Sequence, residues 1–343
     1  MTSRVKLFLG AYVNSTNAQN LNCLALAKYL DKSQFDITVL SLYSQPPVKI
    51  EGVKIFRCIW PHRVVVYWAY FWNIIKADVV YLPKAEILGF NSFICQFFVK
   101  KSFSTIEGIL DDTNFLKAKN KSGANVLNYY ARLSQVFSIS QYIKDFNFKK
   151  HGLISEGEIL ELGTESHLFL NTTYQAAPIT KVILIANNYS KKGVDDFLAL
   201  ANDYSQLEFH LVGEGKKIEN HLPNLICHSK LSQHELSELL KDMQLHIFPS
   251  RSEGFPKVIL ESACAGVPSL VYADYGANQW IDHYQNGFVV QTLDEMKEVI
   301  EYLLNNKTSL NQISKNAIQL GLSYDWKLKV KVWQDAILAL SSK

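Results

Sequence analysis

Short apolar runs alternate with helical segments along this chain, and the whole alternation occurs twice. In the first half, apolar clusters between turn signals predict buried strands. Such alternation predicts a parallel sheet covered by helices on both faces, because parallel strands need long crossover connections. The expected strands are residues 5–9, 37–42, 53–59, 79–82, 104–106 and 136–138, and the expected helices are residues 20–29, 68–75, 93–98, 126–132 and 141–150.

The stretch 162–178 is polar and weakly patterned, so we expect the domain junction there. The alternation then restarts, with expected strands at 181–185, 209–212, 245–248 and 269–272 and helices at 193–202, 233–241 and 257–265. A chain of 343 residues, 48% of them apolar, can fill two cores. The expected fold is α/β, with Rossmann-like parallel-sheet domains at 1–165 and 166–325 and a last helix within 326–343.

The start of the chain, MTSRVKLFLG, places basic residues before an apolar run, as signal peptides do. That run is too short for the apolar region of a leader, and no small-residue cleavage site follows it, so a first buried strand explains it better. The longest apolar stretch, residues 64–72, is about half of the ~18 residues that a spanning helix requires. No membrane span is predicted.

The five cysteines are scattered and lack any C-x-x-C spacing, so they predict free buried thiols in a reducing compartment. We therefore expect a cytoplasmic protein.

The charge is divided unevenly along the chain. Residues 1–150 contain 19 Lys or Arg against 9 Asp or Glu, whereas the remainder contains 16 against 23. A basic half indicates an anionic partner, which could be a phospholipid surface, a lipid-linked phosphate or a nucleic acid. No nucleic-acid motif accompanies the charge, so a membrane surface is favoured, at the inner face of the plasma membrane.

Residues 250–271, SRSEGFPKVILESACAGVPSLV, contain the glutamates Glu253 and Glu261 on either side of a helix start. Gly254 lets the backbone pass close to a ligand, and Pro256 suits the first position of a helix. Glu253 is therefore expected in a loop and Glu261 inside the helix. A helix start offers unpaired N–H groups and a positive dipole end, which suit a phosphate, while carboxylates accept hydrogen bonds from hydroxyls. Sugar plus phosphate is the ligand that this pattern fits.

The stretch EGFP-x-x-x-x-E-x-x-x-x-G-x-P resembles the donor site of glycosyltransferase family 4. The resemblance also covers IANNYSKKGVD at 185–195, LVGEG at 211–215, LSQHELSELLKDMQLHIFPSRSEGFP at 231–256 and NGF at 286–288. It implies a GT-B fold, in which two Rossmann-like domains face each other across a cleft and the last helix, 326–343, crosses back to the first domain. It also implies a retaining, metal-independent hexosyltransferase that uses a nucleotide diphosphate-sugar, of the UDP or GDP type, and no cofactor.

The resemblance assigns roles to the matching residues. Lys192 would offset the charge that accumulates on the leaving diphosphate. Glu253 would lie over the transferred sugar, and Glu261 would accept hydrogen bonds from the ribose hydroxyls as an ionised carboxylate. Backbone N–H groups of Gly254, Phe255 and Lys257 would hold sugar or phosphate oxygens, and Gly213 would let the backbone approach the nucleotide.

One position departs from the family pattern. Many relatives have an arginine five residues before the lysine, and this chain has Asn187 there. Lys191, Arg251 or Lys257 would have to supply the missing positive charge, and the sequence does not choose among them.

In the first domain, the loop from Gly10 to Asn20 is expected to face the diphosphate and the acceptor. Its amides and hydroxyls, among them Asn14, Ser15 and Asn17, either bind sugar hydroxyls or cap the following helix. After the strand at 104–106, Glu107 stands where the family often has histidine, so it would orient the donor sugar or act on the acceptor hydroxyl.

Two further patterns concern metals and membranes. Asp111 and Asp112 are adjacent without a D-x-D triplet, and the histidines lack ligand spacing, so no metal site is predicted. Residues 60–72 contain six aromatic side chains. They predict either a helix buried under a sheet or a surface that enters a membrane interface.

The sequence thus predicts a retaining glycosyltransferase that moves a sugar to a glycan or lipid-linked acceptor in polysaccharide or cell-envelope synthesis. The first domain would bind the acceptor and the second the donor. Two alternatives stay open, a nucleotide-sugar epimerase of the same fold and a non-catalytic protein that binds nucleotide sugars. A dinucleotide-dependent dehydrogenase is disfavoured, because no strand leads into G-x-G-x-x-G.

Overall fold

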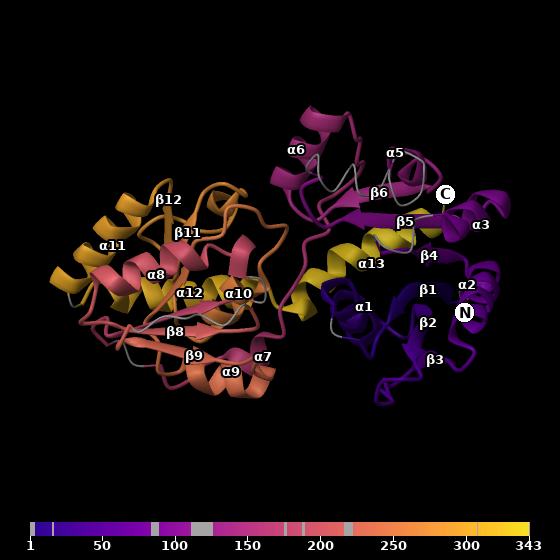
Figure 1. Ribbon diagram of the computed structural model, residues 1–343. Helices are drawn as coiled ribbons and strands as arrows, with labels where there is room; N and C mark the ends of the chain where they lie inside the picture. The colour runs from indigo at the N-terminus through magenta and orange to yellow at the C-terminus, as the bar shows by residue number, and fades with distance from the viewer. Residues whose placement is uncertain are drawn as a thin grey trace. The chain divides into compact units, whose positions relative to one another are not determined.

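The computed structural model describes residues 4–15, 17–83, 89–110, 126–174, 177–186, 189–215, 222–306 and 308–342. The chain divides into two compact units, one of Met1–Leu162 with Trp326–Lys343 and the other of Gly163–Asp325 (Figure 1). Each unit contains a six-stranded sheet with a core of its own.

All strands of the first sheet are parallel, in the order β3-β2-β1-β4-β5-β6. The order reverses between β1 and β4, as in doubly wound nucleotide-binding folds. The strands are β1 (Val5–Tyr12), β2 (Phe35–Leu42), β3 (Val53–Cys58), β4 (Val79–Tyr81), β5 (Lys101–Ile106) and β6 (Gln135–Ser138), and the helices are α1 (Ala18–Tyr29), α2 (His62–Lys76), α3 (Phe90–Phe97), α5 (Val126–Tyr130) and α6 (Gln141–His151).

The last helix of the chain, α13 (Trp326–Ser342), belongs to the first unit. Its Trp333 is fully buried, packs edge-on against Tyr81 with the ring centroids 5.6 Å apart, and donates a hydrogen bond to the Glu161 carbonyl oxygen at 2.9 Å. A large aromatic side chain with its N–H paired explains why this helix docks on the unit.

The second sheet is also parallel and has the order β12-β11-β10-β7-β8-β9. This is the same winding as in the first unit, with the reversal between β7 and β10. Its strands are β7 (Lys181–Ile185), β8 (Glu208–Val212), β9 (Leu225–His228), β10 (Leu245–Phe248), β11 (Ser269–Tyr272) and β12 (Phe288–Val290), and its helices are α7 (Ser166–Phe169), α8 (Val194–Asp203), α9 (Gln233–Leu240), α10 (Lys257–Cys264), α11 (Leu293–Asn305) and α12 (Leu310–Ser323).

Every strand and helix that the sequence analysis expected is present, with ends that shift by three residues or fewer except at α2, which begins six residues before its expected start. The elements α7, β9, β12, α11 and α12 were not predicted. The expectation that all cysteines are buried is wrong for Cys227, which is exposed on the edge strand β9; the other four are buried, and all five are free thiols. Among the helices that the structure describes, none has the length and apolar composition to cross a bilayer.

Candidate functional site

The strand-order reversal of the second sheet places two polar loops side by side. β7 and β10 are neighbours, with Val182 opposite Leu245, and both are buried along most of their length. In open parallel sheets, ligands bind beyond the carboxyl ends of the strands at this kind of reversal. The loop after β7 carries Lys192, and the loop after β10 carries Glu253.

These two loops are joined by an ion pair. The Lys192 Nζ donates to both carboxylate oxygens of Glu253, at 2.5 Å to Oε1 and 2.6 Å to Oε2. The Glu253 side chain is 8% exposed and the Lys192 side chain 26%, so both charges are largely removed from water. Such a pair requires good geometry and further hydrogen bonds to offset its desolvation.

The surroundings of the pair supply those contacts. Ser250 is fully buried, and its hydroxyl donates to Glu253 Oε1. The Lys192 ammonium also lies over the Phe248 ring, 5.5 Å from its centroid, which is cation–π distance. On the other side, burial and then the negative charge of Glu253 raise the pKa of the buried Tyr275 hydroxyl.

A glycine explains how the loops come so close. Gly193, which follows Lys192 and precedes α8, has φ +68°, in the left-handed region. A Cβ built there would lie 2.0 Å from the carbonyl oxygen of Pro249. Only glycine allows both the conformation and the contact, so this residue sets Lys192 beside the loop of Glu253.

The loop after β8 meets the loop after β7 through Tyr189. The Tyr189 hydroxyl donates to the Gly213 carbonyl oxygen at 3.3 Å, and a Cβ on Gly215 would lie 2.2 Å from the Tyr189 ring. Gly213, predicted to admit the nucleotide, is therefore buried at the end of β8 under a tyrosine. The loops after β7, β8 and β10 therefore adjoin one another at the carboxyl ends of the strands of the second sheet.

Glu261 lies just over one turn inside α10, whose N-cap is Pro256 rather than a side chain that accepts a hydrogen bond. Burial raises the pKa of Glu261 to about 7, and the nearby positive charge of Lys257 opposes this shift. The sequence analysis expected an ionised carboxylate here. With this raised pKa, the carboxyl is only partly ionised near neutral pH.

The other predicted donor-site residues lie around the start of α10. The guanidinium of Arg251 donates to Asp274 at 2.9 Å and lies 3.9 Å from the Tyr272 ring centroid. Phe255 packs against Trp280. Gly254, Phe255 and Lys257 are all partly exposed, as backbone N–H donors to a ligand need to be. Asn187 lies outside the residues that the structure describes.

In the first unit, Glu107 follows β5 and is held by three side chains. Its Oε2 accepts from Asn22 at 3.2 Å, and its Oε1 lies 3.1 Å from the Thr105 hydroxyl and 3.3 Å from the Tyr81 hydroxyl. These two hydroxyls lie 2.6 Å from each other, and because each has one proton, one of them donates to the other and the second donates to Glu107. This network fixes the carboxylate at the carboxyl end of the sheet, where a ligand-binding group belongs.

The polar residues expected in the loop of the first unit make hydrogen bonds within that unit. Gly10 is not in the loop but inside β1, where its carbonyl oxygen accepts from Tyr70 at 3.0 Å. Asn14 pairs with the end of β2, accepting from the Leu42 N–H at 2.8 Å and donating to the Leu42 carbonyl at 2.8 Å. Asn17 caps α1. The partly exposed Ser15 makes a turn through its backbone N–H.

No cluster of three or more His, Cys, Asp or Glu side chains suited to a metal ion occurs among the described residues. Asp111 and Asp112 lie outside them.

Sequence reasoning missed Ser250 and Tyr189. The signal for Ser250 is its place three residues before Glu253, where a short side chain at the end of a buried strand can reach back to the carboxylate. Tyr189 gives no comparable signal, because the close approach of Gly215 is visible only in the folded chain.

Residues 176–320 match the model of the family described as glycosyl transferases group 1. The match covers less than half of the chain, all of it in the second unit.

Two relatives illustrate the range of the similarity. An alpha-galactosylglucosyldiacylglycerol synthase of Streptococcus pneumoniae is 25% identical over 268 residues, which are 68% of this chain and 67% of the relative. An uncharacterized glycosyltransferase of Haemophilus influenzae is 24% identical over 168 residues, 45% of this chain. The chain spans about half the length of the curated relatives it matches, 47% for the Haemophilus protein and 56% for an archaeal one.

Among solved structures, HepE of Anabaena in complex with UDP and glucose superposes with a TM-score of 0.74 at 15% identity, over 99% of this chain and 100% of that one. A sucrose-phosphate synthase of Thermosynechococcus elongatus gives a TM-score of 0.76 at 12% identity, over 99% and 100%. These likenesses concern the fold, and they confirm the predicted GT-B class of two parallel-sheet domains.

Proposed function

We propose that this protein is a glycosyltransferase that moves a sugar from a nucleotide diphosphate-sugar to a glycan or lipid-linked acceptor. The observation that carries the proposal is the Lys192–Glu253 pair at the strand-order reversal of the second sheet. It supplies a cation and a carboxylate where this sheet type binds nucleotides.

In the proposed site, Lys192 holds the diphosphate. An ammonium group has three N–H donors, and within the described residues two of them go to Glu253, which leaves one for a phosphate oxygen. As the bond between the sugar C1 and the phosphate oxygen breaks, negative charge gathers on the diphosphate and is stabilised by this donor. The acceptor hydroxyl oxygen bonds to C1, and its proton leaves with the diphosphate.

Glu253 and Glu261 then have different tasks. Glu253 bonds a hydroxyl of the transferred sugar and offsets positive charge at C1 in the transition state, whereas Glu261 accepts hydrogen bonds from the ribose. The N–H groups of Gly254, Phe255 and Lys257 at the start of α10 hold sugar or phosphate oxygens. Glu107 is proposed to act in the first unit on the acceptor.

Finer points are part of the same proposal. The E-x7-E stretch supports membership of glycosyltransferase family 4 and transfer with retention of the anomeric configuration, without a metal. The complex of HepE with UDP and glucose supports a UDP-type donor. The glycolipid named for the pneumococcal relative supports a lipid acceptor, and the basic first half supports a peripheral position at the inner face of the plasma membrane.

The test is mass spectrometry of the products from a panel of UDP- and GDP-sugars incubated with membrane extract. We expect one donor to yield a new glycoconjugate, whose anomeric configuration by NMR equals that of the donor. Glu261→Ala should weaken UDP binding, and Glu253→Ala should chiefly lower turnover. A change in donor stereochemistry without acceptor would indicate an epimerase. Nucleotide binding without turnover across the panel would indicate a binding protein.

A further inference from the structure

The first unit exposes a continuous row of aromatic side chains on α2 and α3. We call it the aromatic face. On α3 its members are three, four and seven residues apart, and on α2 two neighbouring residues are joined by one that follows four residues later, so they project from one side of each helix. They are Tyr67 (59% exposed), Trp68 (63%), Trp72 (49%), Phe90 (43%), Phe93 (52%) and Phe97 (67%).

This face is not the side that α2 uses to pack on its own sheet. The opposite side of the helix buries Ala69, Tyr70 and Ile74, and Tyr70 packs edge-on against Phe8 of β1 with the ring centroids 5.7 Å apart. The helix therefore has two apolar stripes, and only one is needed for the core. Large exposed apolar patches on a folded unit mark interaction sites.

The two helices hold the face together as one surface. Tyr67 contacts Phe90 edge-on at 5.4 Å between ring centroids, and Phe71 contacts Phe98 at 6.1 Å. A shallow apolar pocket of about 250 Å³ lies between them, lined by Tyr67, Trp68, Phe71 and Phe90. In Figure 1, α2 and α3 lie next to each other at one edge of the first unit.

The segments that form the aromatic face and flank it are rich in basic residues. Residues 53–77 and 89–106, which contain β3, α2, α3 and β5, include six Lys or Arg and no Asp or Glu. Lys76 is exposed, and its ammonium lies 4.3 Å from the Trp72 ring centroid. The face is thus both aromatic and basic.

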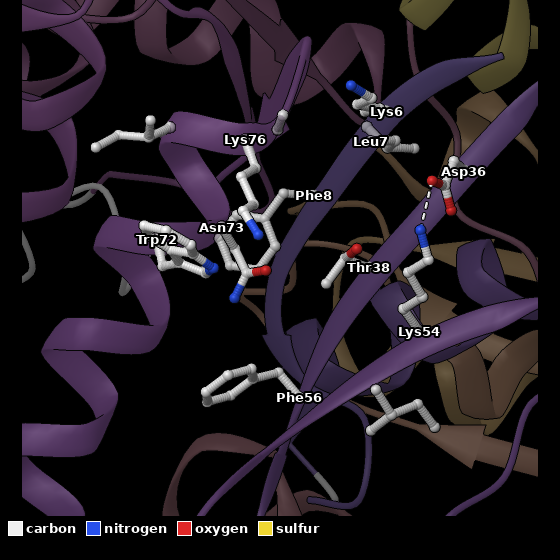
Figure 2. A pocket seen from close by; sticks show the side chains of 13 residues that line it. Lys6, Leu7, Phe8, Asp36, Thr38, Lys54, Phe56, Trp72, Asn73 and Lys76 are labelled. Carbon is white, nitrogen blue, oxygen red and sulfur yellow. Dashed lines mark hydrogen bonds and ion pairs between the residues drawn. The ribbon is translucent and has the colours of Figure 1, made fainter.

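A basic groove continues from the aromatic face. It has a volume of about 720 Å³ and includes Trp72 among its lining residues together with Lys6, Lys54 and Lys76. Figure 2 shows these side chains around the groove, with Asp36 paired to Lys54 at 2.6 Å. Three ammonium groups against one carboxylate leave the groove positive.

We propose that the aromatic face, with the groove beside it, docks this protein on a lipid bilayer that contains anionic lipids. Tyr and Trp are favoured at the level of the lipid headgroups, and Phe inserts below them. Lysines beside them are attracted by the negative surface potential of a membrane that contains anionic lipids. The exposed aromatic rings and the neighbouring lysines therefore both fit an anionic bilayer.

A second copy of the chain fits less well. A two-fold dimer would set the same patch against itself, so the exposed Lys76 beside Trp72 and the other basic residues of one copy would lie close to those of the other. Like charges brought together in this way oppose association.

The inference rests on the proposed function in one respect: docking brings the enzyme to an acceptor held in the membrane. The two are tested separately. Vesicle binding reports docking, and UDP binding by calorimetry reports the donor site. If the protein binds UDP but does not bind vesicles, the docking inference alone is overturned. If it binds vesicles but does not bind UDP, the proposed function alone is overturned.

The experiment is co-sedimentation of the full chain with vesicles of phosphatidylcholine alone or with 30% phosphatidylglycerol. We expect binding to the anionic vesicles that weakens in high salt, because the electrostatic part is screened. The double variant Trp68→Ser, Phe97→Ser should bind roughly tenfold or more weakly, since it removes two inserted rings. Phe148→Ser is the matched control, because Phe148 is a similarly exposed ring (59%) on α6 and should bind like the wild type.

The inference would be overturned if Phe148→Ser weakened vesicle binding as much as the double variant does, or if the wild type did not bind anionic vesicles. So would a wild-type dimer in size-exclusion chromatography that the double variant converts to monomer, since the face would then belong to a second copy. UDP binding equal to wild type shows that the double variant is folded.

Discussion

Lys192 and Glu253, 61 residues apart in the chain, form an ion pair in which the ammonium donates to both carboxylate oxygens at 2.5 and 2.6 Å. Each charge depends on the other, because the Glu253 side chain is almost fully buried and Ser250 supplies one further donor. Removing one partner from such a pair costs more than removing one from an exposed pair. The pair is therefore expected to matter for both stability and turnover.

Glu253→Ala should lower kcat about 100-fold or more, since it removes the carboxylate beside the reacting carbon. It should also lower the free energy of unfolding by about 1–3 kcal/mol, because Lys192 and Ser250 lose their partner. Glu253→Gln keeps the shape and an acceptor for Ser250, so it should be more stable than the alanine variant but equally slow. Kinetics and urea unfolding measure both effects, and an alanine variant that is stable and active would refute this role.

Gly193→Ala should lower the free energy of unfolding by about 2 kcal/mol or more, because the left-handed φ and the contact with the Pro249 carbonyl both exclude a Cβ. The loop of Lys192 should shift, so UDP binding should weaken as well. Gly108→Ala is the control, since a Cβ there meets nothing within 4 Å. Similar urea midpoints for the two variants would contradict the explanation.

The carboxyl of Glu261 should make stability depend on pH. Its pKa is about 7 in the folded protein and about 4.5 in the unfolded chain, so the folded state binds more protons between these values. The contribution of Glu261 to stability is therefore present below pH 4.5 and is lost as pH rises through 7. Glu261→Gln should be more stable than the wild type by about 3 kcal/mol at pH 8.5 and nearly equal to it at pH 4.5. A difference that is the same at both pH values would show that burial does not raise this pKa.

Glu107→Gln should lower turnover while leaving UDP binding intact, because Glu107 is held in the first unit by Tyr81, Thr105 and Asn22 and the proposed donor residues lie in the second. Glu158→Gln, at an exposed carboxylate of the same unit, is the control. Calorimetry with UDP and steady-state rates separate the two effects. Unchanged rates in the Glu107 variant would remove it from the proposed chemistry.

The sheets could be predicted from the sequence because their strands are short apolar runs between turn residues. The strands β7, β10 and β11 begin and end where expected, since each is buried on both faces and reads as continuous apolar sequence. The edge strands β9 and β12 were missed. β9 is largely exposed, so its sequence lacks that signal.

The candidate site could be predicted only as a set of residue types. That Lys192 contacts Glu253 depends on the close approach of Gly193 to Pro249, and the raised pKa of Glu261 depends on what surrounds α10. Neither is encoded in local spacing. The same holds for α2, where periodicity shows two apolar stripes but not which of them faces the sheet.

The most direct test of the proposed function compares sugar transfer by Lys192→Met and Lys315→Met, two lysines of the second unit of which only the first pairs with Glu253 among the contacts described. With the donor that the wild type accepts, kcat should fall about 100-fold or more for the Lys192 variant and stay within about threefold for Lys315, an exposed residue of α12 that lacks the transition-state contact. Equal rates in the two variants would contradict the assignment of Lys192 to the leaving diphosphate.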